Sequence, residues 1–308
     1  METVYAFTTA RNIVLRFALT FAVLTAVALV LSACSPLGFV NALTPSDTYR
    51  ATGDVAYGPD PREKLDVYQP LATADAPAPG GGYPVVVFFY GGTWTGGERG
   101  DYRFVGEALA SRGIVTMVAD YRLYPQVRYP DFLTDCARAL AWARREAPRY
   151  GGDAGRLYVM GHSSGAYNAA MLALDPRWLA AEGLSPSAVA GWVGLAGPYD
   201  FLPMTNVTAQ PVFNHPDYPA GSQPIDYASK AAPPAFLGSA ASDDVVNPER
   251  NTRQLADKLG AAGVPVTLRI YASASHYTMI GAFARPLRSV GPVLDDVVAF
   301  VRNDAPRQ

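Results

Sequence analysis

A strand-turn-helix pattern around one serine constrains this chain more than any other feature of its sequence. Residues 156–173 read RLYVMGHSSGAYNAAMLA, in which a short apolar β run passes directly into an Ala-rich helical run. The segment between them, GHSSG at 161–165, has the G-x-S-x-G pattern of a nucleophile elbow. Glycines on both sides let the neighbouring backbone pass without a Cβ clash, while the hydroxyl stands exposed on the turn. The pattern therefore predicts Ser163 as a nucleophile.

Backbone N–H groups that could stabilise an oxyanion are predicted at two places. The helix after Ser163 directs its N-terminus and the Ser164 N–H at the reaction site. A second set follows the apolar run PVVVFFY at 84–90, where the glycine pair Gly91-Gly92 precedes Trp94. A glycine pair directly after a buried strand frees N–H groups to point at one position, and Trp94 can form a wall of the acyl pocket. The alternative is a flexible glycine-rich turn.

Histidine is scarce, which narrows the search for the base that a serine nucleophile needs. The chain contains only His162, His215 and His276. His162 adjoins the nucleophile, and we expect it to pack or hydrogen-bond locally and, with Tyr90 and Trp94, to border the substrate pocket. His215 lies in a loop and could at most touch substrate. His276 follows the last predicted strand, in a loop that can bring it over the carboxyl edge of a sheet, and it is the predicted general base.

The acid that orients this base is expected after the preceding strand. Two neighbouring candidates, Asp243 and Asp244, stand there. Paired acids in a loop are usually only solvated, and spacing alone does not choose between them.

Strands and helices alternate along the chain, which predicts a doubly wound, mostly parallel sheet of eight strands with helices on both faces. Two short strands, Val55–Tyr57 and Lys64–Tyr68, are expected to enter it as an antiparallel pair. The catalytic domain is expected to span 52–308. Residues 197–233 lack periodicity and are rich in proline and aromatic residues, so we expect a small cap over the pocket, with a surface loop bundle as the alternative.

The amino end reads as a processing segment, residues 1–33. Arg11 and Arg16 precede an uncharged apolar run at 17–31, which has the length of a signal-peptide core. The run ends at LSAC, which resembles a bacterial lipobox, so Cys34 is the predicted lipidation site and 34–51 a tether. This predicts a lipid-anchored protein of the bacterial cell envelope, on the periplasmic or outer-membrane face. A plain signal peptide or a membrane anchor is the alternative.

Composition excludes some classes of function. A formal net charge of −2 gives no support for nucleic-acid binding. The two cysteines, Cys34 and Cys136, lie in segments of very different character, so no disulfide framework is implied and Cys136 is expected in the core.

Assembled, these segments resemble an α/β hydrolase of the bacterial esterase and lipase branch, close to its feruloyl-esterase-like, hormone-sensitive-lipase-like and arylformamidase-like members. The matching motifs are YGGTW at 90–94 for H-G-G-x-W, DYRLYP at 120–125 for D-Y-R-L-x-P, and GHSSG at 161–165 for G-H-S-A-G. The family's acid loop resembles D-x-x-V-x-P, which matches Asp243, Val246 and Pro248 and favours Asp243 over Asp244. Tyr90 stands where the family has a histidine that braces the loop.

The resemblance implies a serine carboxylesterase that needs no metal or organic cofactor. Ser163, His276 and Asp243 would form the triad, Gly91, Gly92 and Ser164 the oxyanion hole, and a short-chain or aryl carboxylic ester the substrate. Two alternatives stay open from the sequence. One is an arylformamidase-like amide hydrolase, and the other is a catalytically silent hydrolase fold that serves as a binding lipoprotein.

Overall fold

The computed structural model describes residues 36–72 and 78–302, which belong to two compact units, Met1–Leu43 and Thr44–Gln308. Within the first unit the described residues form one short helix, α2 (Pro36–Ala42). The predicted signal peptide at 1–33 and the predicted lipidation site Cys34 lie outside the described residues. Among the residues that are described, no helix has both the length and the apolar character needed to cross a membrane.

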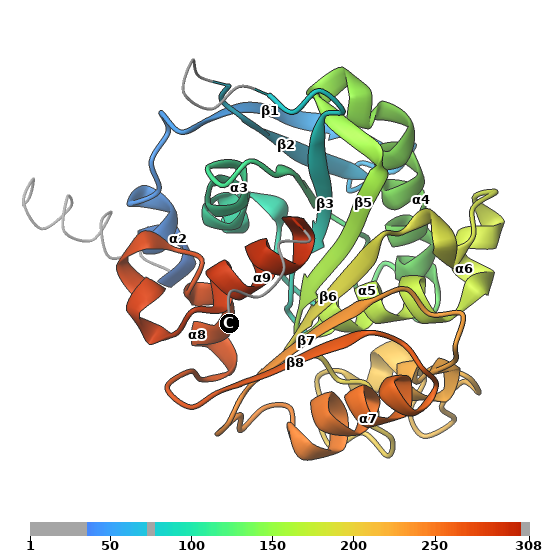
Figure 1. The fold of residues 1–308 in the computed structure, drawn as a ribbon. Coiled ribbons are helices and arrows are strands. Elements are labelled where there is room, and N and C mark those ends of the chain that lie inside the picture. The colour runs from blue at the N-terminus through green and yellow to red at the C-terminus, as the bar shows by residue number, and fades with distance from the viewer. Residues whose placement is uncertain (1–35, 73–77, 303–308) are drawn as a thin grey trace, which may run out of the picture. The chain divides into compact units, whose positions relative to one another are not determined.

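The second unit is built on one eight-stranded sheet with the order β1-β2-β4-β3-β5-β6-β7-β8 (Figure 1). The β1–β2 and β2–β4 pairs are antiparallel and all other neighbours are parallel, which confirms the predicted mostly parallel, doubly wound sheet. The strands are β1 (Tyr49–Ala56), β2 (Lys64–Pro70), β3 (Tyr83–Phe89), β4 (Val115–Ala119), β5 (Gly152–His162), β6 (Gly191–Leu195), β7 (Ala235–Ala240) and β8 (Val266–Tyr271).

Helices cover both faces of the sheet, with α3 and α9 on one face and α4, α5 and α6 on the other (Figure 1). The α-helices of this unit are α3 (Arg103–Ala110), α4 (Asp131–Glu146), α5 (Ser164–Leu174), α6 (Pro176–Ala181), α7 (Gln254–Ala261), α8 (His276–Gly281) and α9 (Val293–Arg302). The 3-10 helices are η1 (Arg99–Tyr102), η2 (Ala147–Tyr150), η3 (Pro186–Ala188), η4 (Gln210–Phe213), η5 (Pro224–Tyr227) and η7 (Arg285–Val290), and η6 (Glu249–Arg253) is a π-helix. Cys136 is fully buried in α4 with a free thiol, as expected.

The parallel register brings the carboxyl ends of the central strands to one edge. Phe89 of β3 pairs with Gly161 of β5, and His162 of β5 pairs with Leu195 of β6. Both β3 and the second half of β5 are buried, because helices cover the two faces. The loops that leave β3, β5, β6, β7 and β8 therefore start at the same edge of the sheet, where ligand sites of open α/β sheets lie.

Three local predictions were wrong. The first strand is β1, which begins at Tyr49 rather than Val55 and so includes the last residues assigned to the tether; most of its side chains are exposed, so it carries no alternating pattern. The short helix α6 has no counterpart in the predicted elements. His276 does not lie in a loop: it is the first residue of α8, whose capping box pairs Ser275 with Thr278. A six-residue helix is too short to show the helical period.

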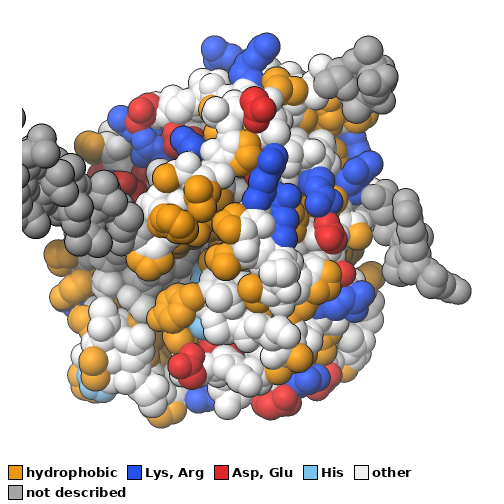
Figure 2. Space-filling model, turned by 90° about the vertical axis from the view of Figure 1, so that its left-hand side faces the viewer, with side chains coloured by type: hydrophobic (Ala, Val, Ile, Leu, Met, Phe, Trp, Pro, Cys, Tyr) orange, Lys and Arg blue, Asp and Glu red, His pale blue; other side chains and the backbone are white. Residues whose placement is uncertain are grey.

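Figure 2 shows the distribution of charge on one face of the molecule. On the face shown in Figure 2, Lys and Arg side chains are interspersed with acidic, hydrophobic and other side chains rather than gathered in one continuous basic stripe.

Candidate active site

The elbow serine occupies a strained turn between β5 and α5. Ser163 has φ 54° and ψ −124°, a region that residues with a side chain rarely adopt. Its N–H donates to the carbonyl of Leu195 on β6 at 2.9 Å, and its carbonyl accepts the N–H of Ala166 at 2.9 Å. These bonds on both sides hold the turn, so the strain is maintained by the sheet and by α5.

The two glycines of the motif are required by close backbone packing. A Cβ at Gly161 would lie 2.0 Å from the carbonyl oxygen of Gly165. A Cβ at Gly165 would lie 2.0 Å from the carbonyl oxygen of Phe89, at the end of β3. No rotamer change relieves such contacts, because the atoms are backbone. Glycine is therefore needed at both positions because α5 crosses β5 and β3 at backbone contact distance.

A chain of hydrogen bonds links serine, histidine and aspartate. Nε2 of His276 lies 3.0 Å from Oγ of Ser163, and Nδ1 lies 2.9 Å from Oδ2 of Asp243. The carboxylate can only accept, so Nδ1 carries the hydrogen and Nε2 is free to accept the serine proton. The side chains of His276 and Asp243 are 2% and 0% exposed, so water does not compete for these bonds.

The backbone of its own loop holds Asp243 in place. Oδ1 of Asp243 accepts the N–H groups of Val245 at 2.9 Å and Val246 at 2.8 Å. Burial raises the pKa of this carboxyl, but the hydrogen bonds from His276 and from these backbone groups outweigh burial, so its pKa lies below the ordinary value. Asp243 is therefore ionised near neutral pH. The neighbouring Asp244 is exposed, and among the described residues only Asp243 of this pair contacts His276.

His162 does not border the pocket, contrary to the sequence prediction. Its side chain is buried, and its Nε2 donates to the backbone carbonyl of His276 at 2.8 Å, with the two ring centroids 5.0 Å apart. Burial, and then the nearby His276, lowers the pKa of His162 to about 3, so the ring is neutral. His162 therefore connects the backbone of His276 to the turn that carries Ser163, and the expected hydrogen bond of His162 is present.

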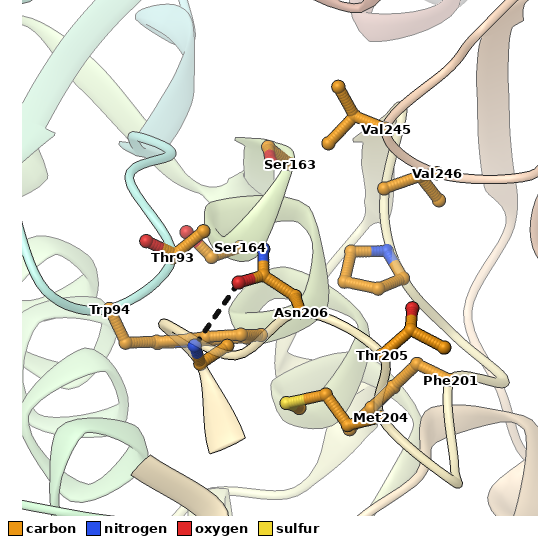
Figure 3. Close-up of a pocket in the computed structure, with 12 residues that line it drawn as sticks. Thr93, Trp94, Ser163, Ser164, Phe201, Met204, Thr205, Asn206, Val245 and Val246 are labelled. Atoms are coloured by element: carbon orange, nitrogen blue, oxygen red, sulfur yellow. Dashed lines mark hydrogen bonds between the residues drawn. The ribbon is translucent and has the colours of Figure 1, made fainter. Parts of the chain in front are cut away.

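A small cavity opens beside Ser163 (Figure 3). Its volume is about 100 Å³, and its walls combine the glycine loop, the elbow, the segment after β6 and the acid loop. Trp94 forms one wall, as predicted, and no charged side chain lines the cavity within the described part of the chain. The lining residues are Thr93, Trp94, Ser163, Ser164, Pro198, Phe201, Met204, Thr205, Asn206, Ala209, Val245 and Val246.

Trp94 is fixed in an aromatic cluster. Its Nε1 donates to Oδ1 of Asn168 on α5 at 3.0 Å. Its ring meets Tyr167 edge-on at 5.2 Å and Phe213 edge-on at 4.9 Å between centroids. Edge-to-face aromatic pairs of this kind contribute a favourable interaction energy in addition to that of burying their surface. The pocket wall is thus attached to the nucleophile helix and to the segment at 197–233.

Side-chain amides hold the segment at 197–233 over the cavity. Oδ1 of Asn251 accepts the N–H groups of Tyr199 at 2.6 Å and Asp200 at 2.8 Å. Oε1 of Gln223 accepts those of Phe201 at 2.8 Å and Leu202 at 2.9 Å. The segment contains only the short turns η4 and η5, and half of the lining residues come from it.

The glycine loop approaches Ser163 as closely as glycine permits. A Cβ at Gly91 would lie 2.9 Å from Cβ of Ser163, and one at Gly92, where φ is 133°, would lie 2.3 Å from the carbonyl oxygen of Gly96. Of the three predicted oxyanion residues only Ser164 lines the cavity, and Thr93, which was not predicted, lines it from the loop. The signal for Thr93 was its position directly after the glycine pair.

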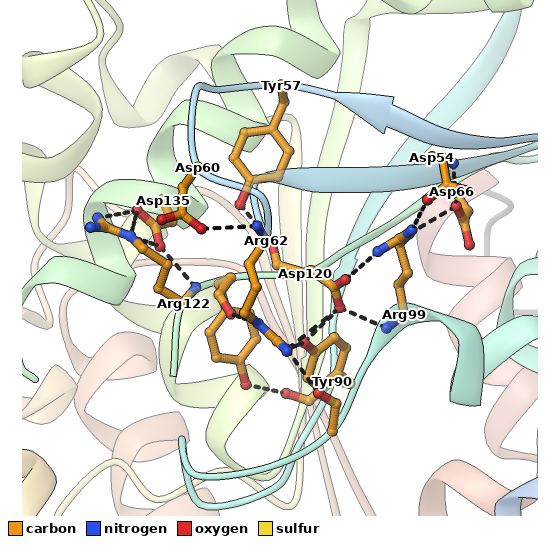
Figure 4. A network of polar contacts seen from close by, with 12 residues as sticks. Asp54, Tyr57, Asp60, Arg62, Asp66, Tyr90, Arg99, Asp120, Arg122 and Asp135 are labelled. Atoms are coloured by element: carbon orange, nitrogen blue, oxygen red, sulfur yellow. Dashed lines mark hydrogen bonds and ion pairs between the residues drawn. The ribbon is translucent and has the colours of Figure 1, made fainter. Parts of the chain in front are cut away.

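Tyr90 also lies away from the cavity, contrary to the prediction, and braces the loop from behind (Figure 4). Its hydroxyl donates to Oδ1 of Asp120 at 2.7 Å and accepts from Nη2 of Arg62 at 2.8 Å. The same Arg62 nitrogen donates to the carbonyl of Gly97 at 2.8 Å, and Arg99 binds Asp120 through its backbone and its guanidinium. Tyr90, Arg62 and Asp120 thus connect both ends of the loop at 91–97.

Aromatic stacking adds to this brace. The ring of Tyr90 stacks between two tyrosine rings. The centroid distance and interplanar angle are 5.4 Å and 11° to Tyr102, and 5.0 Å and 24° to Tyr121. Burial raises the pKa of the Tyr90 phenol far above its ordinary value, so the hydroxyl stays protonated and remains a donor to Asp120.

Comparison with known proteins identifies the family. Residues 65–259, more than half of the chain, match the BD-FAE family. Esterase LipC of Mycobacterium tuberculosis is 32% identical over 226 residues, which are 67% of this chain and 54% of LipC. The isoprenylcysteine alpha-carbonyl methylesterase ICME of Arabidopsis thaliana is 28% identical over 269 residues, which are 80% of this chain and 61% of ICME. The chain thus spans roughly half to three-fifths of the length of these relatives.

Solved structures agree on the fold. Esterase Est2 of Thermogutta terrifontis, solved with butyrate, superposes with a TM-score of 0.66 at 22% identity, covering 85% of this chain and 97% of that one. A bacterial heroin esterase superposes with a TM-score of 0.65 at 24% identity, covering 86% of this chain and 89% of that one. The chain therefore has the α/β hydrolase fold and belongs to the BD-FAE family.

Proposed function

We propose that this protein is a serine carboxylesterase that uses Ser163 as nucleophile, His276 as general base and acid, and Asp243 as the group that orients His276. The observation that carries the proposal is the buried hydrogen-bond chain from Asp243 through His276 to Oγ of Ser163, at the mouth of an uncharged cavity. The matched relatives are named as esterases, which supports ester hydrolysis as the reaction.

The proposed reaction follows from this geometry. As Oγ of Ser163 attacks the acyl carbon, Nε2 of His276 takes the serine proton, and the ionised Asp243 stabilises the imidazolium that forms. His276 then gives this proton to the leaving alkoxy oxygen as the acyl C–O bond breaks. Water attacks the acyl-enzyme with His276 again as base, which releases the acid and restores Ser163.

Charge that develops on the carbonyl oxygen needs N–H donors. The N–H of Ser164, at the start of α5, and the N–H groups of the loop at 91–93 are the donors in this proposal, because both segments adjoin Ser163. Thr93 belongs to this group together with Gly91 and Gly92, since it lines the cavity.

The size of the cavity supports a short acyl chain. A volume of about 100 Å³ is smaller than the roughly 150 Å³ of an apolar cavity that accepts benzene. An acetyl to butyryl group is therefore the proposed acyl part, on an alkyl or aryl alcohol.

The test compares p-nitrophenyl acetate, p-nitrophenyl octanoate and an aryl formamide, with Ser163→Ala as the matched variant. We expect rapid hydrolysis of the acetate, slower hydrolysis of the octanoate, and loss of both activities in the variant. Preferential hydrolysis of the formamide would contradict the carboxylesterase assignment, and absence of turnover by folded wild-type protein would contradict a catalytic role altogether.

We also propose that the protein is lipid-anchored in the bacterial cell envelope through Cys34. The support is the sequence at 17–34, an apolar run that ends at LSAC. Incorporation of a radiolabelled fatty acid into the wild type but not into Cys34→Ser is the expected result, and equal labelling of both would contradict it.

A further inference from the structure

Two exposed apolar side chains belong to residues that contact the acid or the histidine of the hydrogen-bond chain. In the described part of the chain only six large hydrophobic side chains are exposed, and they include Val245 at 44% and Tyr277 at 71%. An apolar side chain that is exposed beside a reactive centre can contact a ligand there. Both residues adjoin members of the hydrogen-bond chain, since Val245 follows the acid by two positions and Tyr277 follows the base directly.

One of them contacts the His276 ring, and the other is bonded to Asp243 through its backbone. The ring of Tyr277 meets the ring of His276 edge-on, with centroids 5.3 Å apart. Tyr277 is in the first turn of α8, where the Ser275 and Thr278 capping box holds the backbone. Val245 donates its N–H to Asp243 and lines the cavity with Ser163, on the side opposite Trp94 (Figure 3).

The chemistry distinguishes the two sides of the cavity. His276 must give its proton to the alkoxy oxygen that leaves, so the alcohol part of an ester has to lie beside His276. The acyl part then extends toward the walls formed by Trp94, Phe201 and Met204. Val245 lines the cavity and the Tyr277 ring contacts the His276 ring, so these two exposed apolar side chains are available to an alcohol part in that position.

We propose that Tyr277 and Val245 form a leaving-group subsite that receives an apolar and preferably aromatic alcohol. This inference rests on the proposed carboxylesterase function and adds the class of alcohol to it. An aryl ring can pack against the exposed phenol of Tyr277 and the methyl groups of Val245. Asp244, exposed next to Val245, disfavours an anionic alcohol.

The test uses esters that share the acetyl group, so that the acyl-enzyme is the same for all of them. Phenyl acetate, ethyl acetate and glyceryl monoacetate are compared by kcat/KM, which reports acylation and hence the leaving group. In Tyr277→Ser we expect the phenyl-to-ethyl ratio of kcat/KM to fall about two- to tenfold, the range of one aromatic contact. Because the ratio is compared between proteins, the different intrinsic reactivity of the esters cancels.

Two further variants make the result specific. Tyr277→Phe keeps the ring, so we expect it to keep the wild-type phenyl-to-ethyl ratio of kcat/KM. Val245→Thr keeps the shape but replaces a methyl group by a hydroxyl, so we expect it to lower that ratio. Leu71→Ser removes an exposed apolar side chain that does not line this cavity, and we expect it to leave the ratio and the activity unchanged. Thermal unfolding of each protein checks that it is folded.

Two outcomes would overturn the inference, and they are distinguishable. If the wild type hydrolyses these esters but Tyr277→Ser changes all three kcat/KM values by the same factor, the subsite is wrong and the esterase function stands. If the wild type hydrolyses none of them and Ser163→Ala behaves identically, the esterase function fails and the subsite fails with it.

Discussion

Removing one buried hydroxyl behind the glycine loop tests whether that loop is held for catalysis. Tyr90→Phe keeps the ring between Tyr102 and Tyr121 but removes the bond to Asp120 at 2.7 Å and the bond from Arg62 at 2.8 Å. The Asp120 carboxylate keeps its contacts with Arg99, so the substitution weakens the network without leaving an unpaired charge.

Stability and activity are both expected to change, by different amounts. A hydrogen bond to a charged group contributes about 1.5–3 kcal/mol, so we expect a loss of about 2 kcal/mol in the free energy of unfolding. Complete removal of an oxyanion donor costs roughly 10²- to 10³-fold in kcat, and a loop that is loosened rather than removed costs less. We expect kcat to fall about tenfold, or about 1.4 kcal/mol, with KM within about twofold, because the oxyanion forms only in the transition state.

The assay pairs ester hydrolysis with urea unfolding in the wild type, Tyr90→Phe and Tyr271→Phe. Tyr271 is a buried control whose hydroxyl donates to Asp296 of α9 at 2.8 Å, away from the loop. It should lose stability by a similar mechanism while keeping kcat. The reasoning is refuted if Tyr90→Phe keeps kcat within twofold of the wild type, or if Tyr271→Phe lowers kcat as much.

Three further predictions concern the elbow, the buried histidine and the acid. Gly165→Ala places a Cβ 2.0 Å from a β3 carbonyl and should cost at least about 3 kcal/mol in unfolding experiments, whereas Gly260→Ala in α7, with open space at its Cβ, should be neutral or stabilising. The pKa of His162 is about 3 in the folded protein, against an ordinary value of 6.5. Between these two pH values the unfolded chain binds a proton that the folded chain does not. The free energy of unfolding therefore falls as the pH decreases from 6.5 toward 3. At pH 4.5 this loss is about 2–3 kcal/mol, and His162→Gln should show a flatter profile in urea unfolding. Asp243→Asn should lower kcat about 10³- to 10⁴-fold and Asp244→Asn less than about twofold, and similar kinetics for the two would contradict the assignment of the acid.

The elbow was predictable because its determinants are local. Gly161 and Gly165 are four residues apart, and the clash that each avoids is with backbone at the crossing of β5, α5 and β3. A short sequence motif is enough to record which positions must be glycine. The fold class was also predictable from local sequence, because buried parallel strands produce continuous apolar runs such as the one in β3.

The choice of acid was not available from residue spacing, because it depends on a turn. Oδ1 of Asp243 accepts two N–H groups of its own loop, which directs the carboxylate at His276, while Asp244 faces solvent. Only the family motif favoured Asp243 in the sequence. The aspartates are adjacent, so no periodic signal separates them.

The pocket walls were the least predictable part. The segment at 197–233 is held from outside by the amide of Asn251 and linked internally by the amide of Gln223, which bond backbone N–H groups that have no partner in a helix or strand. Such bonds join residues about 20 to 50 positions apart and leave no pattern in the sequence. The same applies to the Tyr90 network, in which Arg62 and Asp120 meet across the sheet edge.

The two residues wrongly placed in the pocket, Tyr90 and His162, turn out to support opposite halves of the site. Tyr90 holds the loop of the proposed oxyanion donors, through Asp120 and Arg62. His162 holds the backbone of the base, through the carbonyl of His276. Because each attaches its half to a strand end, at β3 and at β5, the sheet itself fixes the distance between the proposed oxyanion donors and the proposed base. A tyrosine in the family's histidine position is therefore compatible with the reaction, since the position acts through the loop and not on the substrate.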